Sequence, residues 1–301
     1  MPSLYEGNKI LPSDILNGKV QIGNVYYVRQ TSETGYSDFF DKYNYVNNAG
    51  QNSVQPTITA ALAVAGDYDT IYVTPGTYEE EGMTITQAGL KLIGLAVTGL
   101  TRNTPMILGE TKALLNINAD DVEVAGFHFY QVGAFAAVIV ATTAFGDAVW
   151  RTYIHDCHWD GDAMTYGIIL GQTGGAGAAE AVAAVVERCK FLYCVTACIQ
   201  NNSENVVIQK CLFRCIASCI GIEDTPDGDD RPDRWYLDNR FVTGDATTYG
   251  IKVTNTPTVG LVFADGNHFN STFGSDVYCM SKKTGYVGMN YHGIVLLKVT
   301  T

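Results

Sequence analysis

Two stretches, RCKFLYCVTACIQ (Arg188–Gln200) and KCLFRCIASCIGI (Lys210–Ile222), repeat one pattern, and this repetition decides the fold. Each holds three cysteines, and the matching cysteines lie 21 or 22 residues apart. Each also has a phenylalanine, Phe191 or Phe213, two positions after its first cysteine. A unit of this length cannot bury its own apolar face, whereas stacked copies can. The pair therefore predicts a repeat architecture.

The same pattern continues on both sides of this pair. Its first motif has three positions: a small residue or Asn, any residue, and an aromatic residue. The aromatic residues are 22 to 32 positions apart, at Phe129, Trp159, Phe191, Phe213, Phe241, Phe269 and, more loosely, Tyr291. A second motif has a central Gly or Cys, at spacings of 21 to 31 residues, and its central positions are Gly167, Cys198, Cys219, Gly250 and Cys279. Two motifs that keep their order predict the coils of a solenoid whose strands lie about 4.8 Å apart.

The kind of repeat follows from what the units lack. Leucine-rich repeats need a Leu-x-x-Leu-x-Leu frame and helical repeats need apolar stripes with a period of 3.6 residues, and the units show neither. The sequence therefore favours a parallel β-helix. We expect residues 1–45 to form an N-terminal arm or small adaptor and residues 46–301 to form the β-helix domain.

A short helix is expected before the first coil. Ser53 or Thr57 is the expected N-cap, Pro56 lies near the first turn, and Gly66 ends the helix. One apolar face would then consist of Ile58, Ala61, Leu62 and Ala65. The following TIYVTPGTYEE (Thr70–Glu80) predicts a strand, a Pro-Gly turn and a second extended segment.

The stretch DYDTIYVTPGTY (Asp67–Tyr78), followed by LKLIGLAV (Leu90–Val97) and VEVAGFHF (Val122–Phe129), resembles the opening of the pectate-lyase-like right-handed β-helix superfamily. The resemblance covers residues 53–292. It implies an all-β fold, a single right-handed parallel β-helix of about eight coils behind a short capping helix. It implies little about activity, because that superfamily includes lyases, hydrolases, epimerases, adhesins and phage proteins.

The cysteines are predicted to be buried packing residues. Other coils carry Asn or Gly at the same positions, which favours small side chains in a crowded interior. We expect Cys189 above Cys211, Cys194 above Cys215 and Cys198 above Cys219, on successive coils. Disulfides and a zinc site are the weaker alternatives, because the spacings lack a C-x2-C knuckle. The predicted inward ladder comprises Cys157, Cys189, Cys194, Cys198, Cys211, Cys215, Cys219, Cys279, Phe129, Trp159, Phe191, Phe213, Phe241 and Phe269.

The composition of the chain argues against some classes of partner. The formal net charge is −12, from 19 basic and 31 acidic residues, which disfavours nucleic acid as a partner. The longest uncharged apolar stretch, Val132–Phe145, is shorter than the roughly 18–20 residues that a membrane-spanning helix needs. No signal peptide is recognisable at residues 1–18. We therefore expect a chain made in the cytoplasm of a host cell and working in a virion.

The most acidic stretch is EDTPDGDDRPDR (Glu223–Arg234). Its closely spaced carboxylates are compatible with a calcium loop, and calcium is the only cofactor that the sequence suggests. They are equally compatible with the carboxylate pair of a glycosidase, which needs two acids about 5–9 Å apart, and with an exposed acidic loop. The calcium candidates are Asp224, Asp227, Asp229 and Asp230, and the catalytic candidates add Asp233.

A second candidate is IHDCHWDGDAM (Ile154–Met164). If Cys157 and Trp159 point inward, alternation along the strand places the neighbouring polar residues on the outer face. These weaker catalytic candidates are Asp156, His158 and Asp160. Such a row is suited to a metal or a sugar, but also to an ordinary solvated surface.

The catalytic signatures of the resembled enzymes are missing, including Asn-Thr-Asp, Gly-His-Gly, Arg-Ile-Lys and Trp-Ile-Asp-His. We therefore expect a phage virion structural protein, such as a capsid decoration, fibre or small tail-spike component. It would be a homotrimer that contacts other virion proteins through its N-terminal arm, with surface polysaccharide as a further candidate ligand. The alternative is a polysaccharide-degrading enzyme, a lyase or glycoside hydrolase such as a phage depolymerase, that uses the carboxylates above.

Overall fold

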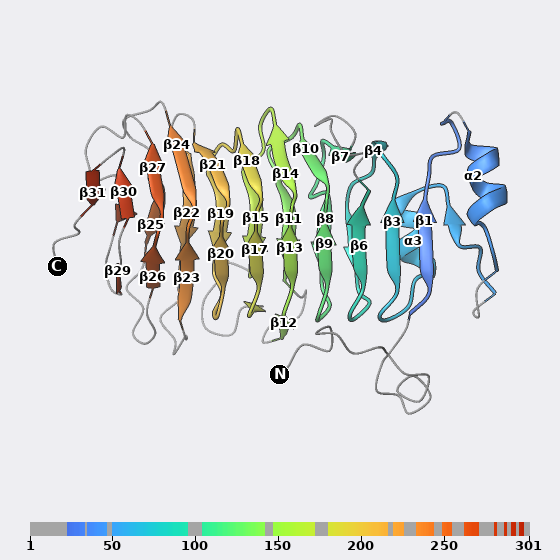
Figure 1. The fold of residues 1–301 in the computed structure, drawn as a ribbon, viewed down its shortest axis with the longest axis horizontal. Helices are drawn as coiled ribbons and strands as arrows, with labels where there is room; N and C mark the ends of the chain where they lie inside the picture. The colour runs from blue at the N-terminus through green and yellow to red at the C-terminus, as the bar shows by residue number, and fades with distance from the viewer. Residues whose placement is uncertain are drawn as a thin grey trace.

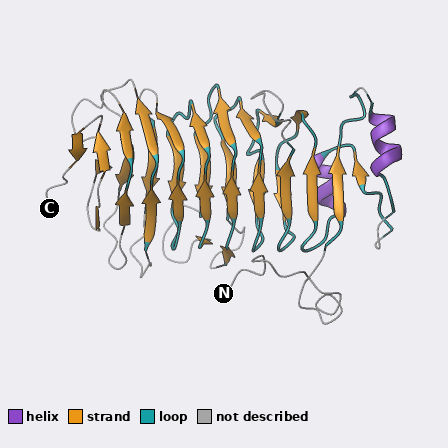
Figure 2. Ribbon diagram, in the orientation of Figure 1, coloured by secondary structure: helices purple, strands orange, loops and turns teal. Residues whose placement is uncertain are grey.

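The chain winds into a right-handed parallel β-helix (Figure 1). This computed structural model describes residues 23–33, 35–46, 50–95, 104–141, 147–171, 180–215, 219–225, 233–243, 249–254, 262–270, 280–281, 286–287, 290–292 and 295–297. Successive strands of one coil belong to three different sheets, and each sheet runs along the axis of the β-helix (Figure 2). The fold class predicted from the repeat is thereby confirmed.

The three sheets are named first, second and third in the order in which the chain enters them. The first sheet contains β1 (Val25–Val28), β2 (Val54–Gln55), β3 (Thr70–Val73), β6 (Lys91–Gly94), β9 (Glu123–Ala125), β13 (Tyr153–His155), β17 (Val185–Glu187), β20 (Val207–Gln209), β23 (Arg234–Leu237), β26 (Val262–Asp265) and β29 (Tyr286–Val287). The second contains β4 (Gly76–Glu79), β7 (Pro105–Gly109), β10 (His128–Gln131), β14 (His158–Gly161), β18 (Lys190–Leu192), β21 (Leu212–Cys215), β24 (Arg240–Thr243), β27 (His268–Asn270), β30 (Asn290–His292) and the antiparallel β31 (Val295–Leu297). The third contains β5 (Met83–Ile85), β8 (Leu115–Ile117), β11 (Ala136–Val140), β15 (Tyr166–Leu170), β19 (Ala197–Asn201), β22 (Ile220–Asp224), β25 (Ile251–Val253) and β28 (Met280–Ser281). A separate pair is formed by β12 (Ala148–Trp150) and β16 (Glu180–Val182).

The N-terminal coil is covered by the helix α3 (Ile58–Val64), as predicted. Thr57 is the N-cap, because its side chain accepts a hydrogen bond from the amide of Ala60. The carboxylate of Glu80 accepts two more from the amides of Ile58 (2.8 Å) and Thr59 (2.7 Å). These bonds satisfy amides that a helix leaves without partners at its start. No helix in the described part of the chain is long and apolar enough to cross a membrane.

The segment expected to be an arm contributes to the first sheet. Strand β1 pairs in parallel with β3, and its Tyr26 and Val28 are fully buried. The helix α2 (Tyr36–Tyr43) follows β1. The β-helix therefore includes residues before the predicted boundary at residue 46. The VYYV run joins the first sheet because its side chains alternate with the two-residue period of a strand.

A continuous stack of aromatic rings fills the interior behind the second sheet. The six predicted rings from Phe129 to Phe269 pack face to face, with centroids 4.6 to 5.2 Å apart and interplanar angles of 19° or less. All six are almost completely buried. The looser match at Tyr291 is out of register with the ladder, because Tyr291 pairs with His268 and His292 pairs with Phe269.

The first column of cysteines is confirmed. Cys157, Cys189 and Cys211 follow one another at the corner between the first and second sheets, where Lys190 and Leu212 donate to the carbonyls of Cys157 and Cys189. The next coil has Asn239 there, and its side-chain oxygen accepts from the Cys211 amide (3.0 Å). The position therefore takes either a small buried thiol or an amide that bonds the adjacent coil.

The other two predicted cysteine pairs are not directly opposite in the strand register, although the Cys198 and Cys219 thiols are neighbours, with 3.8 Å between their Sγ atoms. Ala197 pairs with Ile220 and Ile199 with Ile222, so Cys198 lies opposite Gly221 and not opposite Cys219. Likewise Leu192 pairs with Arg214, which places Cys215 above Tyr193. Two differences in spacing are the reason. Cys215 follows Phe213 by two residues whereas Cys194 follows Phe191 by three, and the chain from Phe213 to Ile222 is one residue longer than that from Phe191 to Ile199. All seven cysteines of the described residues are nevertheless buried free thiols, and Cys279 lies outside those residues.

Truncation of one ring tests the interior stack. We expect Phe213→Ala to lower the free energy of unfolding by about 3–5 kcal/mol, because it leaves a cavity between two stacked rings. Leu212→Ala, on the half-buried outer face of the same strand, should cost much less. Urea unfolding measures both, and equal losses would contradict the ladder as the main stabilising element.

Candidate functional site

The outer face of the second sheet carries a row of residues in register, most of them polar. Each lies one position before a ladder residue, so alternation turns its side chain away from the interior. From β4 to β27 the row consists of Thr77, Met106, His128, His158, Lys190, Leu212, Arg240 and His268. The stack behind the sheet thereby fixes the position of every residue in front of it.

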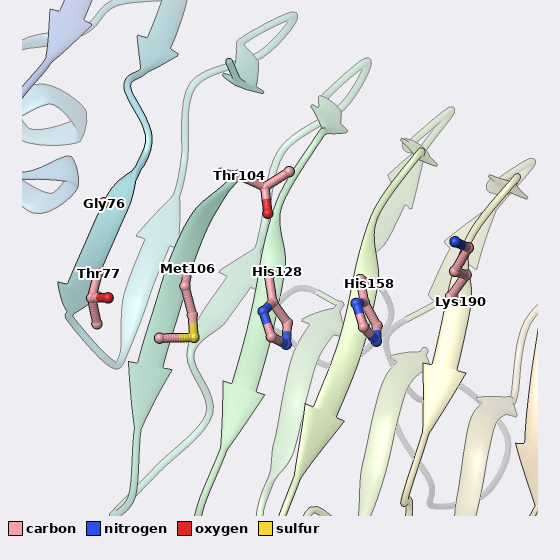
Figure 3. A pocket seen from close by; sticks show the side chains of 7 residues that line it. All are labelled: Gly76, Thr77, Thr104, Met106, His128, His158 and Lys190. Atoms are coloured by element: carbon pink, nitrogen blue, oxygen red, sulfur yellow. The ribbon is translucent and has the colours of Figure 1, made fainter. Parts of the chain in front are cut away.

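A groove with a volume of about 520 Å³ lies along the N-terminal half of this row (Figure 3). Figure 3 shows the side chains of His128, His158 and Lys190 on successive strands, projecting to the same side. The lining residues are Gly76, Thr77, Thr104, Met106, His128, His158 and Lys190. The groove therefore offers two imidazoles and one amino group to a ligand.

The two imidazoles are stacked and held in their neutral form. Their ring centroids lie 4.6 Å apart at an interplanar angle of 11°. Burial lowers the pKa of His128, and burial followed by the charges of His128 and Lys190 lowers the pKa of His158 to about 4. The Nε2 atoms of both rings are buried without a hydrogen-bond partner. At neutral pH each ring is therefore an uncharged base.

Two further residues of the outer face lie beside the imidazoles. Asp160 follows His158 by two positions and faces the same way, and its carboxylate lies within 4.8 Å of ligand atoms of both histidines. Tyr130 pairs with Asp160 across β10 and β14, and its hydroxyl donates to Asp162 (3.0 Å). The groove thus combines neutral bases, a carboxylate and a cation.

Asp156 does not belong to this group, which corrects the predicted row of three. It occupies the corner between β13 and β14 with a φ of 54°, so it does not alternate with the strand residues that follow it. Its carboxylate bonds Arg188 (2.7 Å) and His155 (2.6 Å), and Arg188 is the main cause of its lowered pKa. These contacts belong to a charge network on the outer face of the first sheet, which also includes Glu123 and Glu187.

Asp224 is placed inside the β-helix, which corrects its assignment as a surface carboxylate. It is fully buried, and one of its oxygens lies 3.3 Å from Nε of the equally buried Arg234. Arg234 Nε also donates to the carbonyl of Ser203 (2.9 Å). Burial raises the pKa of Asp224 to about 6. A buried carboxylate paired with arginine is accessible neither to a polysaccharide nor to a surface calcium ion.

The remaining carboxylate candidates stay untested. Asp233 is half-buried directly before β23. Asp227, Asp229 and Asp230 lie outside the described residues. Calcium binding by this stretch therefore remains a prediction from the sequence, without Asp224 as a ligand.

Two residues of the groove, His128 and Lys190, were missed at the sequence level. Both precede a ladder aromatic in motifs that define the repeat, GFHF and CKF. Once the aromatic is placed inside, the residue before it must point outward in every coil. The signal was therefore present in the repeat itself, at the variable central position of each motif.

Comparison with known proteins gives matches among solved structures. No protein-family model matches the sequence, and neither does any curated protein. A pectin methylesterase in complex with a hexasaccharide is similar with a TM-score of 0.51, 12% identity, and coverage of 83% of this chain and 80% of that chain. The Aspergillus niger pectin methylesterase is similar with a TM-score of 0.50, 12% identity, and coverage of 91% and 85%. The Agl-KA catalytic domain is similar with a TM-score of 0.50, 10% identity, and coverage of 84% and 49%.

These similarities concern the fold. The chain shares its parallel β-helix with enzymes that act on polysaccharides, which confirms the resemblance at the level of architecture. The phage virion type of that architecture has no counterpart among these three structures.

The pKa of His158 predicts a change in stability with pH. It falls from about 6.5 in the unfolded chain to about 4 in the folded protein, so the unfolded state binds more protons between these pH values. Acidification from pH 6.5 to 4 should therefore destabilise the fold through His158. We expect His158→Gln to flatten this part of the stability profile in urea titrations. His268→Gln is the control, and an unchanged slope for His158→Gln would refute the prediction.

The buried ion pair gives a second stability test. Arg234→Ala should lower the free energy of unfolding by about 3–5 kcal/mol at pH 8, because it leaves the Asp224 carboxylate buried without a counter-charge. The loss should shrink at pH 5, where that carboxyl group is protonated. The double variant Asp224→Leu/Arg234→Met should lose less than Arg234→Ala. Urea unfolding at both pH values measures these losses. A double variant that is less stable than Arg234→Ala would contradict the prediction.

Proposed function

We propose that the protein is a hydrolase that binds an acidic polysaccharide along the outer face of the second sheet and acts on it in the groove. The observation that carries this proposal is the register of two neutral imidazoles and a lysine on adjacent strands, on a fold shared with pectin methylesterase. None of the similar structures reported above is a virion protein, so they support the enzyme alternative better than the structural role.

The row suits an extended polymer. Its residues repeat along the axis with the strand spacing of about 4.8 Å, which is similar to the length of one sugar residue in an extended chain. Successive sugars would therefore meet successive coils. Lys190 and Arg240 are both exposed in this row, and Arg214 is exposed on the strand between them. Such cations on a chain of net charge −12 provide local attraction for carboxylate groups.

The groove contains the groups that hydrolysis needs. The neutral imidazole of His158 can accept a proton from an attacking water molecule at neutral pH. The ammonium group of Lys190, on the adjacent strand, can stabilise the negative charge that develops on an ester or carboxyl oxygen. This assignment differs from the acidic stretch that the sequence suggested, because Asp224 is buried.

A panel of acidic polysaccharides tests the proposal. Polygalacturonate, methyl-esterified pectin and alginate are incubated with the protein, and binding and hydrolysis are measured separately. We expect Lys190→Ala to weaken binding about 10- to 150-fold, because a hydrogen bond to a charged group is worth about 1.5–3 kcal/mol. We expect His158→Gln to bind normally and to lose about 10²–10⁴-fold in rate.

Lys210→Ala is the matched control for Lys190→Ala. Lys210 lies at the corner between β20 and β21, and its ammonium group bonds Glu187 on the first sheet. Its binding should equal that of the wild type. If no polysaccharide binds, or if Lys210→Ala weakens binding as much as Lys190→Ala, the groove is not the binding site.

Four further expectations remain predictions from the sequence. They are the homotrimer, contacts with virion proteins through residues 1–45, location in a virion and calcium binding by the acidic stretch.

A further inference from the structure

We propose that His128, His158 and Asp160 form a binding site for a divalent transition-metal ion, and that zinc fits this ligand set best. The site lies in the groove described above and does not require the proposed hydrolysis; while a metal ion is bound there, the coordinating nitrogen of His158 is not available as a general base. Two imidazoles and one carboxylate are a common protein ligand set for zinc.

The geometry brings the three ligands together from two adjacent strands. Each side chain offers one ligand atom, and these atoms lie within 4.8 Å of one another. Ligands of one tetrahedral zinc ion lie about 3–3.5 Å apart when the bonds are about 2.0–2.2 Å long. His128 and His158 are direct neighbours across β10 and β14. The two imidazole rings are stacked at an interplanar angle of 11°, so their in-plane lone pairs run parallel, and the rings must rotate out of the stack for both nitrogens to converge on one ion.

The backbone behind these ligands is rigid. The residues that follow the two histidines, Phe129 and Trp159, stack at a centroid distance of 5.2 Å and are completely buried. The ladder thus fixes the spacing of the histidines without any contribution from a metal. A site whose ligands are positioned beforehand binds with a smaller loss of conformational entropy.

The nitrogens of the two histidines are available. Their Nε2 atoms are buried and have no hydrogen-bond partner, which is costly for a polar atom unless a ligand satisfies it. The imidazoles also lie at the wall of an open groove, so an ion reaches them from this side once the rings turn their nitrogens toward it, and it keeps a coordination position for water or a sugar carboxylate.

His155 shows the contrasting case of a histidine whose nitrogens are both occupied. Its Nδ1 lies 2.6 Å from Asp156 and its Nε2 lies 3.2 Å from Glu123. It is therefore held in a charge network and offers no free lone pair. This makes His155→Gln a control of the same residue type on the neighbouring sheet.

A second cluster, formed by Cys198, Cys215 and Cys219, is a weaker metal candidate. All three thiols are fully buried, and metal binding requires thiolates. Their place among apolar side chains gives an ion no route from solvent and no compensation for the thiolate charge. Packing explains these cysteines, whereas it does not explain the orphaned imidazole nitrogens.

Metal titration tests the proposal without any polysaccharide. The protein is stripped with EDTA, exchanged into clean buffer and titrated with zinc chloride by calorimetry, and with cobalt chloride by visible absorption. We expect one ion per chain. His128→Gln, His158→Gln and Asp160→Asn should each weaken binding at least tenfold, since loss of even an outer-shell partner costs about 10–100-fold.

The controls decide between this site and other sites. His155→Gln and His268→Gln should keep the wild-type affinity, and thermal melting followed by circular dichroism checks that each variant is folded. The proposal is overturned if zinc does not bind, if the control variants lose as much affinity as the site variants, or if the double variant His128→Gln/His158→Gln binds like the wild type. Polysaccharide binding is measured separately in EDTA, so either proposal can fail while the other stands.

Discussion

The interaction on which the structure depends is the face-to-face stacking of one aromatic ring per coil, from Phe129 to Phe269. The stack holds the coils in register, because a shift by one residue would turn every ring of the second sheet toward solvent. Rings of this size bury more apolar surface than any other side chains and gain further from offset stacking. The stack therefore supplies both stability and alignment.

Alignment inside the β-helix determines the surface outside it. Since side chains alternate along a strand, the residues that precede the rings must form an outer row with the same spacing. The histidine pair and Lys190 lie in this row, and the packing behind them fixes the backbone positions from which their side chains project. A groove built on strands in this way needs no long loop to position its functional groups.

The sequence predicted those features that depend on a regular period. The ladder, the column from Cys157 to Cys211 and the α3 helix with Thr57 as N-cap all follow from local pattern, and the structure contains them. His128 and Lys190 were also predictable, because the same rule that places the aromatics inside places the preceding residue outside.

Other features of the fold depend on local departures from the repeat, which the spacing of the motifs does not predict. Asp156 adopts a left-handed conformation at a corner, which removes it from the strand alternation. One extra residue before Ile222 shifts Cys219 out of the expected column. The acidic stretch from Glu223 to Arg234 looks like one loop in the sequence, but Asp224 is the last residue of β22 and Arg234 the first of β23, and both point inward, where the two charges stabilise each other. Their distance in space, set by the return of the chain to the first sheet, is not visible in a charge pattern.

We expect the protein to bind its ligand on the outer face of the second sheet. The direct test is a crystal structure with a bound oligogalacturonate. We expect sugar density across β10, β14 and β18, with a carboxylate beside Lys190 and a sugar next to the two imidazoles. Density on the outer face of the first or third sheet, with the groove empty, would contradict it.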